Sequence, residues 1–271
     1  MFWLSAIFLL PFEGSYNGRL ARCLRASRPQ DEIQTGRAAR FTGYLSYEYR
    51  EYYRRKLPHI HHPGTTLFVT FRLAGSIPQT VLQTWRSERD WLKAKENQAK
   101  DEETRISFHR RWFKRFEDVL HSSGEGPMWL GEETVAAMMQ ECLHFRDGKL
   151  YELHAFCIMS NHVHIVFMPL LDAQKLQPKI TTQGLRLVSD DPDLQAIMQS
   201  IKSYSAHKAN KLLQREGEFW ESESYDDWVR DDEEFMRIVR YVLENPVKAG
   251  LVRNWREWSW SYVKEEDFPG E

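Results

Sequence analysis

Two apolar segments joined by a tight connection constrain the fold of this chain more than any other feature. They read KLYELHAFCIMS and HVHIVFMPL, and they meet at Ser160-Asn161. Both are rich in β-branched and aromatic residues, and two such runs joined by a short polar connection are typical of a β-hairpin. The sequence therefore predicts two antiparallel strands that are connected at Ser160-Asn161.

The remaining segments predict the rest of the fold. TTLFVTFRL, from Thr65 to Leu73, has the composition of a strand, and GEFWESESYDDWV is expected to be extended. Helical spacing predicts a long charged helical region from Gln79 to about Leu120, followed later by helices in GEETVAAMMQECLHF, PDLQAIMQSIKSYSAHKANKLL and DDEEFMRIVRYVLEN, the last ended by Pro246. Residues 171–192 are expected to be an irregular excursion. This order indicates an α+β fold, an antiparallel sheet with helices packed against it.

The charge balance gives no sign of a nucleic-acid partner. The 271 residues carry a net charge of -2, so any surface for a polyanion must be local. The segment RISFHRRWFKRFEDVL interleaves aromatic residues with Arg110, Arg111, Lys114 and Arg115. This cluster would suit a phosphate backbone, and a solvated helix face explains it equally well.

Cysteine usage and hydropathy favour the cytoplasm. Cys23, Cys142 and Cys157 are far apart, so neither a disulfide framework nor a zinc cluster is expected. No run reaches the roughly 18 apolar residues of a membrane helix, so no membrane partner is expected. The start, MFWLSAIFLLPFEG, resembles the apolar part of a signal peptide but has no preceding basic residue. We expect residues 1–42 to be a loosely ordered extension before a domain spanning 43–265, and a start codon assigned too far upstream is the alternative.

Two histidines in the second strand of the hairpin are candidate metal ligands. Side chains alternate faces along a strand, so His162 and His164 point to one side while Val163 points into the core. Two imidazoles on one face can chelate a divalent ion. The alternative is a pair of polar residues at a sheet surface. His59 and His61 have the same spacing, but they lie in a predicted loop and are not expected to be ligands.

The last predicted helix carries a candidate nucleophile. Tyr241 lies about 130° from the centre of the apolar stripe, at 100° per residue. Asn245, four residues on, shares its side of the helix. A phenol one turn before a carboxamide fits a nucleophile beside a metal ligand; a surface tyrosine and an asparagine helix cap before Pro246 is the alternative. The stripe comprises Phe235, Ile238, Val239, Val242 and Leu243.

Three further aromatic residues have competing interpretations. Tyr204 lies at the edge of its helix's apolar stripe, and a packing or DNA-facing role is favoured over that of a nucleophile. Trp220 and Tyr225 are expected to be core or sheet aromatics, and stacking on an unpaired base is the alternative.

Several motifs together resemble a known family. MSNHVHIVF, FWESESYDDWVRDDEEF and RYVLENPVKAGLV, in this order, resemble the REP-associated tyrosine transposases, which are single-tyrosine HUH transposases. TLFVTFRL is similar to the first strand of that family, and the resemblance covers roughly Tyr44 to Tyr262. It implies a ferredoxin-like HUH core. The departures are the N-terminal extension, a helical insertion at about 79–146 and the excursion at 171–192.

The resemblance also implies site residues and an activity. His162 and His164 match the pair that holds Mg²⁺ or Mn²⁺, Tyr241 matches the nucleophile, and Asn245 matches the third metal ligand. Proteins of this family cut single-stranded DNA near hairpins and rejoin it through a covalent 5′-phosphotyrosine, without ATP. The implied partner is single-stranded DNA with hairpins, bound by a monomer or a homodimer.

Elementary chemistry favours this activity over two alternatives. A covalent phosphotyrosine conserves the energy of the phosphodiester bond, so rejoining needs no fuel. Imidazole ligands suit Mn²⁺ at least as well as Mg²⁺. One alternative is an inactive, hairpin-binding regulator, and the complete set of matched residues argues against it. The other is a phosphohydrolase of the histidine-triad type, which requires a third histidine where Val166 stands.

Overall fold

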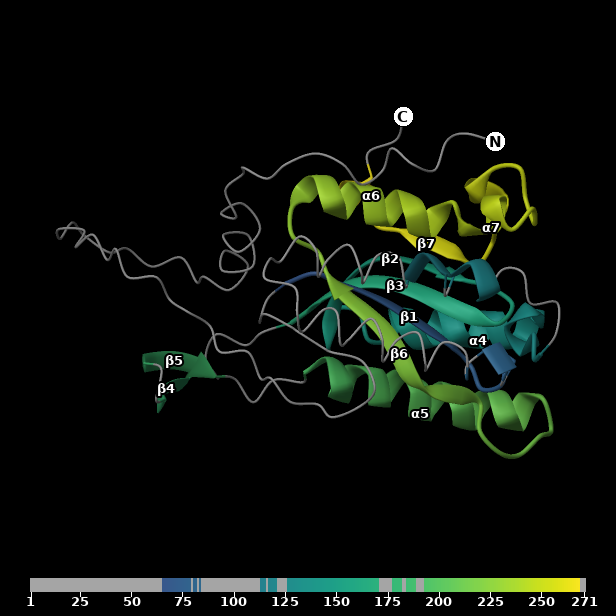
Figure 1. Ribbon diagram of the computed structural model, residues 1–271, viewed down its shortest axis with the longest axis horizontal. Coiled ribbons are helices and arrows are strands. Elements are labelled where there is room, and N and C mark those ends of the chain that lie inside the picture. The colour runs from purple at the N-terminus through teal and green to yellow at the C-terminus, as the bar shows by residue number, and fades with distance from the viewer. Residues whose placement is uncertain are drawn as a thin grey trace.

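The computed structural model describes residues 65–78, 80–81, 83, 113–115, 117–120, 126–170, 177–181, 184–188 and 193–268. A five-stranded antiparallel sheet with the strand order β6-β1-β3-β2-β7 forms its centre (Figure 1). The strands are β1 (Leu67–Leu73), β2 (Tyr151–Ile158), β3 (His162–Pro169), β6 (Trp220–Trp228) and β7 (Ser261–Val263). The predicted hairpin is confirmed, because β2 and β3 pair directly, with Ile158 opposite Val163.

The connections between the strands are those of a ferredoxin-like unit. Helix α4 (Glu133–His144) lies between β1 and β2, and α5 (Leu194–Leu212) lies between β3 and β6. The resulting β-α-β-β-α-β chain order with the sheet order β6-β1-β3-β2 is the ferredoxin-like arrangement. The predicted α+β fold is therefore confirmed. Helix α4 falls within the region 79–146, yet it packs on the sheet as the first crossover helix.

Helices α4 and α5 cover one face of the sheet. Val163 and Ile165 of β3 point toward this face, together with Phe71 of β1, as the alternation of side chains predicts. They meet Met139 of α4 and Ile201 of α5, and all five side chains are fully buried. This main core therefore leaves the histidines of β3 on the opposite face.

Helix α6 (Asp232–Leu243) covers that opposite face (Figure 1). Asp231 precedes it and caps it, because its side chain accepts a hydrogen bond of 2.7 Å from the backbone N–H of Glu234. The predicted apolar stripe is confirmed, since Phe235, Val239, Val242 and Leu243 are buried and Ile238 packs partly buried beside them.

Two predictions about the chain between these elements are wrong. The supposedly irregular residues 171–192 contain a second hairpin, β4 (Gln177–Thr181) and β5 (Gly184–Val188). Its register comes from backbone pairing across a very short connection, which needs no apolar alternation. Likewise, α6 ends at Leu243 rather than at Pro246, which lies inside the short helix α7 (Asn245–Lys248). Proline is tolerated there because the first turn of a helix has unbonded N–H groups anyway.

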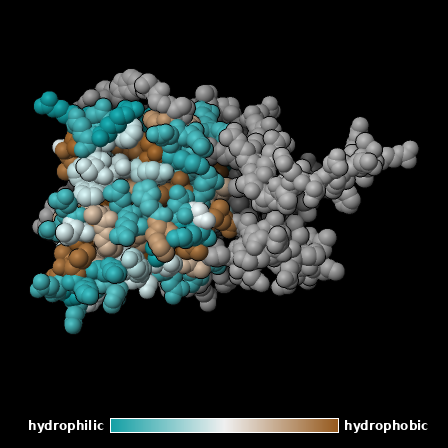
Figure 2. Space-filling model, turned by 180° about the vertical axis from the view of Figure 1, so that it is seen from behind, coloured by the Kyte–Doolittle hydropathy of each residue, from teal (hydrophilic) through white to brown (hydrophobic). Residues whose placement is uncertain are grey.

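The other described elements are short. They include the 3₁₀ helices η1 (Trp129–Gly131), η3 (Trp255–Glu257) and η4 (Glu265–Asp267), and helical turns at 113–115 and 117–120. Within the described ranges, no helix is both long and apolar enough to cross a membrane. Figure 2 shows hydrophilic and hydrophobic side chains interspersed over one face of the molecule.

Candidate metal centre

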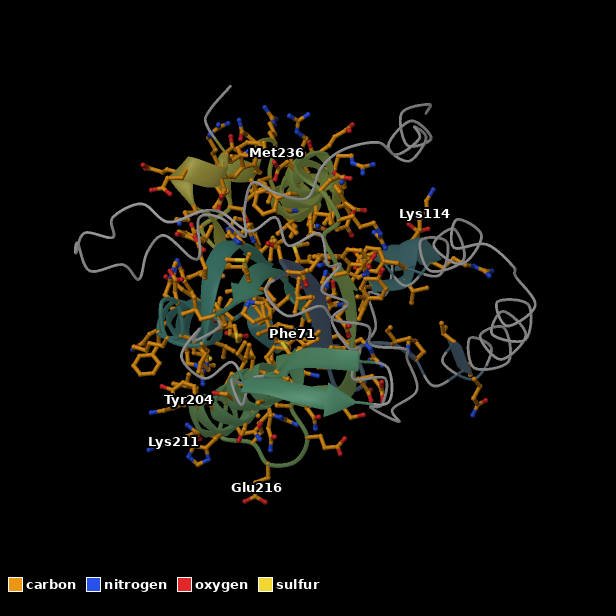
Figure 3. The ribbon with its side chains drawn as sticks, turned by 90° about the vertical axis from the view of Figure 1, so that its left-hand side faces the viewer. Phe71, Lys114, Tyr204, Lys211, Glu216 and Met236 are labelled. Atoms are coloured by element: carbon orange, nitrogen blue, oxygen red, sulfur yellow. The ribbon has the colours of Figure 1, made fainter. Side chains whose placement is uncertain are left out.

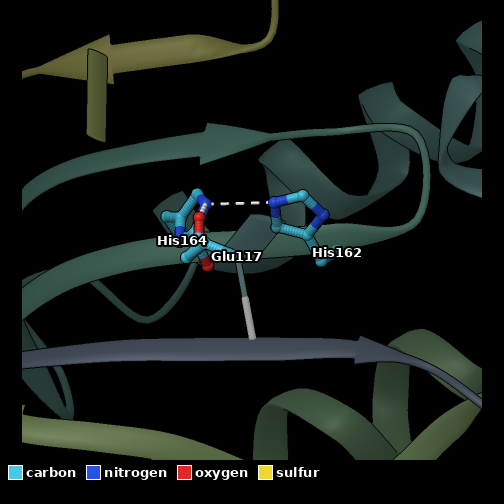
Figure 4. A group of neighbouring side chains, drawn as sticks. All are labelled: Glu117, His162 and His164. Atoms are coloured by element: carbon cyan, nitrogen blue, oxygen red, sulfur yellow. Dashed lines mark hydrogen bonds and ion pairs between the residues drawn. The ribbon is translucent and has the colours of Figure 1, made fainter. Parts of the chain in front are cut away.

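The two histidines of β3 lie side by side on the face under α6. Their Nε2 atoms are 3.0 Å apart, and the residues are 1% and 0% exposed for His162 and His164 (Figure 4). They are therefore not a polar pair at a solvated sheet surface. A buried imidazole pair needs a compensating partner, since desolvated polar groups are costly unless they are bonded.

Neighbouring side chains fix the orientation of both rings. Nδ1 of His162 lies 2.6 Å from Oδ1 of Asn161, whose Nδ2 donates to the carbonyl of Leu120. That second bond fixes the amide, so Asn161 presents an acceptor and Nδ1 of His162 carries the proton. The lone pair of His162 is then on Nε2, which faces His164. Nδ1 of His164 is held by the hydroxyl of Thr70 at 2.8 Å. Metal-binding histidines are commonly oriented in this way.

A carboxylate completes the group. Glu117 lies in the helical segment 117–120, is 5% exposed, and places Oε2 3.5 Å from Nε2 of His164. One ligand atom from each of Glu117, His162 and His164 lies within 4.8 Å of the others. Two imidazole nitrogens and a carboxylate oxygen form a donor set that fits Mn²⁺ better than Mg²⁺. The residues present therefore fit a divalent cation.

Reasoning from the sequence missed Glu117. The segment that contains it has the pattern of a charged helix, in which arginines and lysines are the most conspicuous residues. A signal was nevertheless present, because Phe113, Glu117 and Leu120 are spaced i, i+4 and i+7 and so share one helix face. An acidic residue between two apolar ones on the buried face is a candidate for a site.

Asn245 is buried at the start of α7, one turn after Tyr241. Its Nδ2 donates to the carbonyl of Tyr241 at 2.8 Å and lies 3.4 Å from the carbonyl of Val242. It therefore caps the end of α6, as the alternative interpretation expected. Its Oδ1, however, is buried and has no hydrogen-bond partner among the described residues. An oxygen in that state could serve a cation, so the two interpretations are compatible.

Tyr241 lies beside the histidines rather than at the surface. Its ring is half-buried, with its centroid 5.7 Å from that of His164 and 6.0 Å from that of Phe68. Its hydroxyl donates a hydrogen bond to Oε2 of Glu117. Nζ of Lys248 lies 4.6 Å from the centroid of the Tyr241 ring. The phenol is thus connected to the candidate ligands through a single carboxylate.

Burial controls the protonation of this pair. It raises the pKa of Tyr241 well above the usual value of a phenol, and the charge of Glu117 adds to this effect. Burial also raises the pKa of Glu117 to about 8, although the hydrogen bond from Tyr241 and the charge of Lys248 oppose the rise. Both groups therefore hold their protons at neutral pH unless a nearby cation stabilises the anions.

Comparison with known proteins agrees with the motifs. No protein-family model matches the chain. A protein of Haemophilus influenzae, "Putative REP-associated tyrosine transposase", is 25% identical over 138 residues, which make up 49% of this chain and 71% of that protein. The resemblance to the REP-associated tyrosine transposases is confirmed.

A solved structure, "Structure of the REP associates tyrosine transposase bound to a REP hairpin", is also similar to this chain. It is 15% identical, with a TM-score of 0.42, and the match covers 80% of this chain and 82% of that chain.

The basic cluster that the sequence predicts to bind DNA lies only partly within the described residues. Lys114 and Arg115 are exposed on the helical turn that begins with Phe113, and Figure 3 labels Lys114. The ring of Phe113, on the same turn, stacks on Tyr225 at a centroid distance of 4.2 Å. The other two members of the cluster, Arg110 and Arg111, lie outside the described ranges. So do His59 and His61, which are not expected to be ligands.

Burial separates the remaining residues considered from the sequence into core positions and one exposed position. Trp220 and Tyr225 are buried, which confirms them as core aromatics. Cys157 is buried and reduced, and burial raises the pKa of its thiol to about 12, which makes it a poor nucleophile. Tyr204 is 43% exposed on α5, on the face of the sheet opposite the histidines, so it does not belong to the metal centre.

Proposed function

We propose that this chain is a metal-dependent tyrosine transposase or endonuclease that cleaves and rejoins single-stranded DNA beside hairpins. The observation that carries the proposal is the hydrogen bond from Tyr241 to Glu117, which joins a phenol to the histidine pair. The hairpin requirement comes from the transposase resemblance. The same resemblance supports a protein that works in the cytoplasm with its DNA, as a monomer or a homodimer.

The residues of the metal centre have distinct proposed roles. His162, His164 and Glu117 hold a divalent cation, and Asn245 contributes Oδ1 as a further ligand. When bound, Mg²⁺ or Mn²⁺ acts as a Lewis acid that neutralises charge on the non-bridging oxygens of the scissile phosphate. Glu117 also orients the Tyr241 hydroxyl by accepting its hydrogen bond.

The proposed reaction conserves one phosphodiester bond at each step. The Tyr241 oxygen attacks phosphorus and loses its proton, while the bond from phosphorus to the 3′ oxygen breaks and that oxygen gains a proton. The products are a 5′-phosphotyrosine and a free 3′ hydroxyl. Attack by a 3′ hydroxyl on the phosphotyrosine reverses the step and rejoins the strand, so no ATP is consumed. Lys248 is positioned beside the Tyr241 ring to balance charge at the phosphate.

An inactive hairpin-binding regulator remains the second candidate function. It requires the DNA-binding surface but makes no use of the nucleophile or of the metal centre. Tyr241 contacts a buried group made of Glu117 and both histidines, and this conjunction favours the enzyme, because burying three polar side chains without a function is costly.

A covalent-adduct assay tests the proposal. Purified protein with Mn²⁺ should nick a labelled single-stranded DNA that carries a hairpin, and the label should migrate with the protein on a denaturing gel. Tyr241→Phe should abolish the adduct, whereas Tyr204→Phe, at an exposed tyrosine on the other face, should retain it. An adduct that persists in Tyr241→Phe would exclude Tyr241 as the nucleophile, and wild-type binding without any cleavage would favour the regulator.

A further inference from the structure

Two exposed aromatic rings mark a surface far from the metal centre. Phe145, at the end of α4, is 64% exposed and Tyr204, on α5, is 43% exposed. Figure 1 shows α5 on one side of the sheet and α6 on the other. Tyr204 is labelled in Figure 3, where it lies on the outer side of the molecule. The proposed reaction uses neither ring.

Cations surround both rings. Nζ of Lys149 lies 3.4 Å from the ring centroid of Phe145, and Nζ of Lys208 lies 5.7 Å from that of Tyr204. Arg146 follows Phe145 in the sequence, and its Cζ lies 5.3 Å from the ring centroid of Tyr204. All three distances are typical of cation–π contacts.

Acidic residues are scarce on this surface. Helix α5 and the three residues after it, 194–215, contain no aspartate or glutamate, and the exposed positions include His207, Lys208 and Lys211. On α4 and its following turn, Glu133 and Glu141 are exposed, Glu133 at the opposite end of α4 from Phe145, and Asp147 is half-buried, where its Oδ1 accepts a hydrogen bond from the backbone of Leu153. The surface is therefore locally basic although the chain as a whole is slightly acidic.

Buried hydrogen bonds hold the surface rigid. The guanidinium of Arg146 is 6% exposed and donates to the carbonyl of Cys142 at 2.7 Å and to the carbonyl of Ser200 at 2.8 Å. It thereby ties the end of α4 to α5. Because the backbones that carry Phe145 and Tyr204 are fixed to one another, a ligand that contacts both rings does not have to order them first.

We propose that Phe145, Tyr204, Lys149 and Lys208 form a second binding surface for single-stranded DNA, which we call the α4–α5 surface. Unpaired bases stack on exposed aromatic rings irrespective of sequence, while lysines contact the phosphates between them. A protein partner is a poorer match, since each ring is in contact with a cation rather than with further exposed apolar side chains. The α4–α5 surface lies across the sheet from His162, so the DNA that it holds is a part of the strand distant from the cleaved bond.

The inference rests on the proposed function, because it names a further contact for the same DNA. It is tested by the fluorescence anisotropy of a labelled thymine oligonucleotide of about 20 nucleotides. Phe145→Ala and Tyr204→Ala should each weaken binding on the order of tenfold, the effect of losing one stacked base. Met236→Ala and Leu251→Ala are matched controls, since both residues are exposed apolar residues elsewhere, and they should bind like the wild type.

Two further measurements separate the outcomes. Tyr204→Trp should bind at least as tightly as the wild type, and an abasic oligonucleotide should not distinguish Phe145→Ala from the wild type, because it has no base to stack. If a double Phe145→Ala, Tyr204→Ala variant with wild-type Mn²⁺ affinity binds the thymine strand as the wild type does, the α4–α5 surface is excluded. If the wild-type protein still forms the covalent adduct, the proposed function is unaffected by that result. If the wild-type protein forms no adduct, the proposed function itself is wrong.

Discussion

The hydroxyl of Tyr241 donates a hydrogen bond to Glu117, which lies 124 residues earlier in the chain. The same carboxylate oxygen is 3.5 Å from Nε2 of His164. One side chain therefore connects the candidate nucleophile with the candidate metal ligands. Since burial raises the pKa of both Glu117 and Tyr241, the pair resists ionisation in the absence of a cation.

Replacing Glu117 should weaken metal binding. Glu117→Gln removes the negative charge from a donor set that otherwise contains two neutral imidazoles. We expect Mn²⁺ affinity, measured by calorimetry, to fall about tenfold to 100-fold, in the range of changes at metal-supporting residues. Asp118→Asn is the control, because Asp118 is the exposed neighbour on the same helical turn. Equal Mn²⁺ affinities for the two variants would remove Glu117 from the metal centre.

The same substitution should change how stability depends on pH. The pKa of Glu117 in the folded protein is about 8, above its ordinary value of 4.5, so between these values the folded state binds more protons than the unfolded state. Without metal, the wild type should lose stability as pH rises from about 4.5 to about 8. Glu117→Gln has no ionisable group at this position and lacks this loss of stability. The melting temperature of the variant minus that of the wild type should therefore increase as the pH rises over this range. An unchanged difference between the two melting curves would contradict the raised pKa.

The histidines should be required for metal binding. His162→Ala and His164→Ala should each abolish measurable Mn²⁺ binding and adduct formation, because each removes one of two facing Nε2 atoms. His207→Ala should keep the wild-type Mn²⁺ affinity, since His207 is exposed on α5, on the other face of the sheet. Circular dichroism checks that the fold survives, which we expect because the main core on the other face is intact. Retention of Mn²⁺ binding in a folded double variant would place the metal elsewhere.

Two substitutions of Asn245 should separate its role as the cap of α6 from its proposed role as a metal ligand. Asn245→Ala loses both the buried oxygen and the hydrogen bonds to the carbonyls of α6, whereas Asn245→Asp keeps an oxygen and loses the donor. Asn245→Ala should cost about 1 kcal/mol of unfolding free energy for the lost hydrogen bond, and without metal Asn245→Asp should cost more, because it also buries a carboxylate against the carbonyls of α6. Only Asn245→Ala should also reduce Mn²⁺ affinity. If neither variant changes Mn²⁺ affinity, Asn245 is a helix cap and not a ligand.

The basic cluster should contribute to the salt dependence of DNA binding. Each lost phosphate contact flattens the log–log slope by about 0.7 for a single strand, so four substitutions should flatten it by at most roughly 2.8. The variant replaces Arg110, Arg111, Lys114 and Arg115 with serine and should keep its Mn²⁺ affinity. Arg253→Ser, at an exposed arginine after α7, should leave the slope unchanged. An unchanged slope in the fourfold variant would mean that the cluster is a solvated helix face.

Features that depend on local periodicity could be predicted from the amino-acid sequence. Alternation along β3 placed His162 and His164 on one face and Val163 on the other, and the structure shows this arrangement. Helical spacing identified the buried stripe of α6. These predictions succeeded because the direction of a side chain within a regular element is set by the backbone repeat.

Which of these residues meet could be learned only from the packing of the elements. Glu117 reaches His164 and Tyr241 because the helical segment 117–120 packs on the sheet, with Leu120 accepting a hydrogen bond from Asn161. The contact of Tyr241 with Glu117 joins segments more than a hundred residues apart, and the state of the Asn245 oxygen depends on where α6 ends. No local repeat encodes such contacts, because they depend on how separate elements pack around the same face of the sheet.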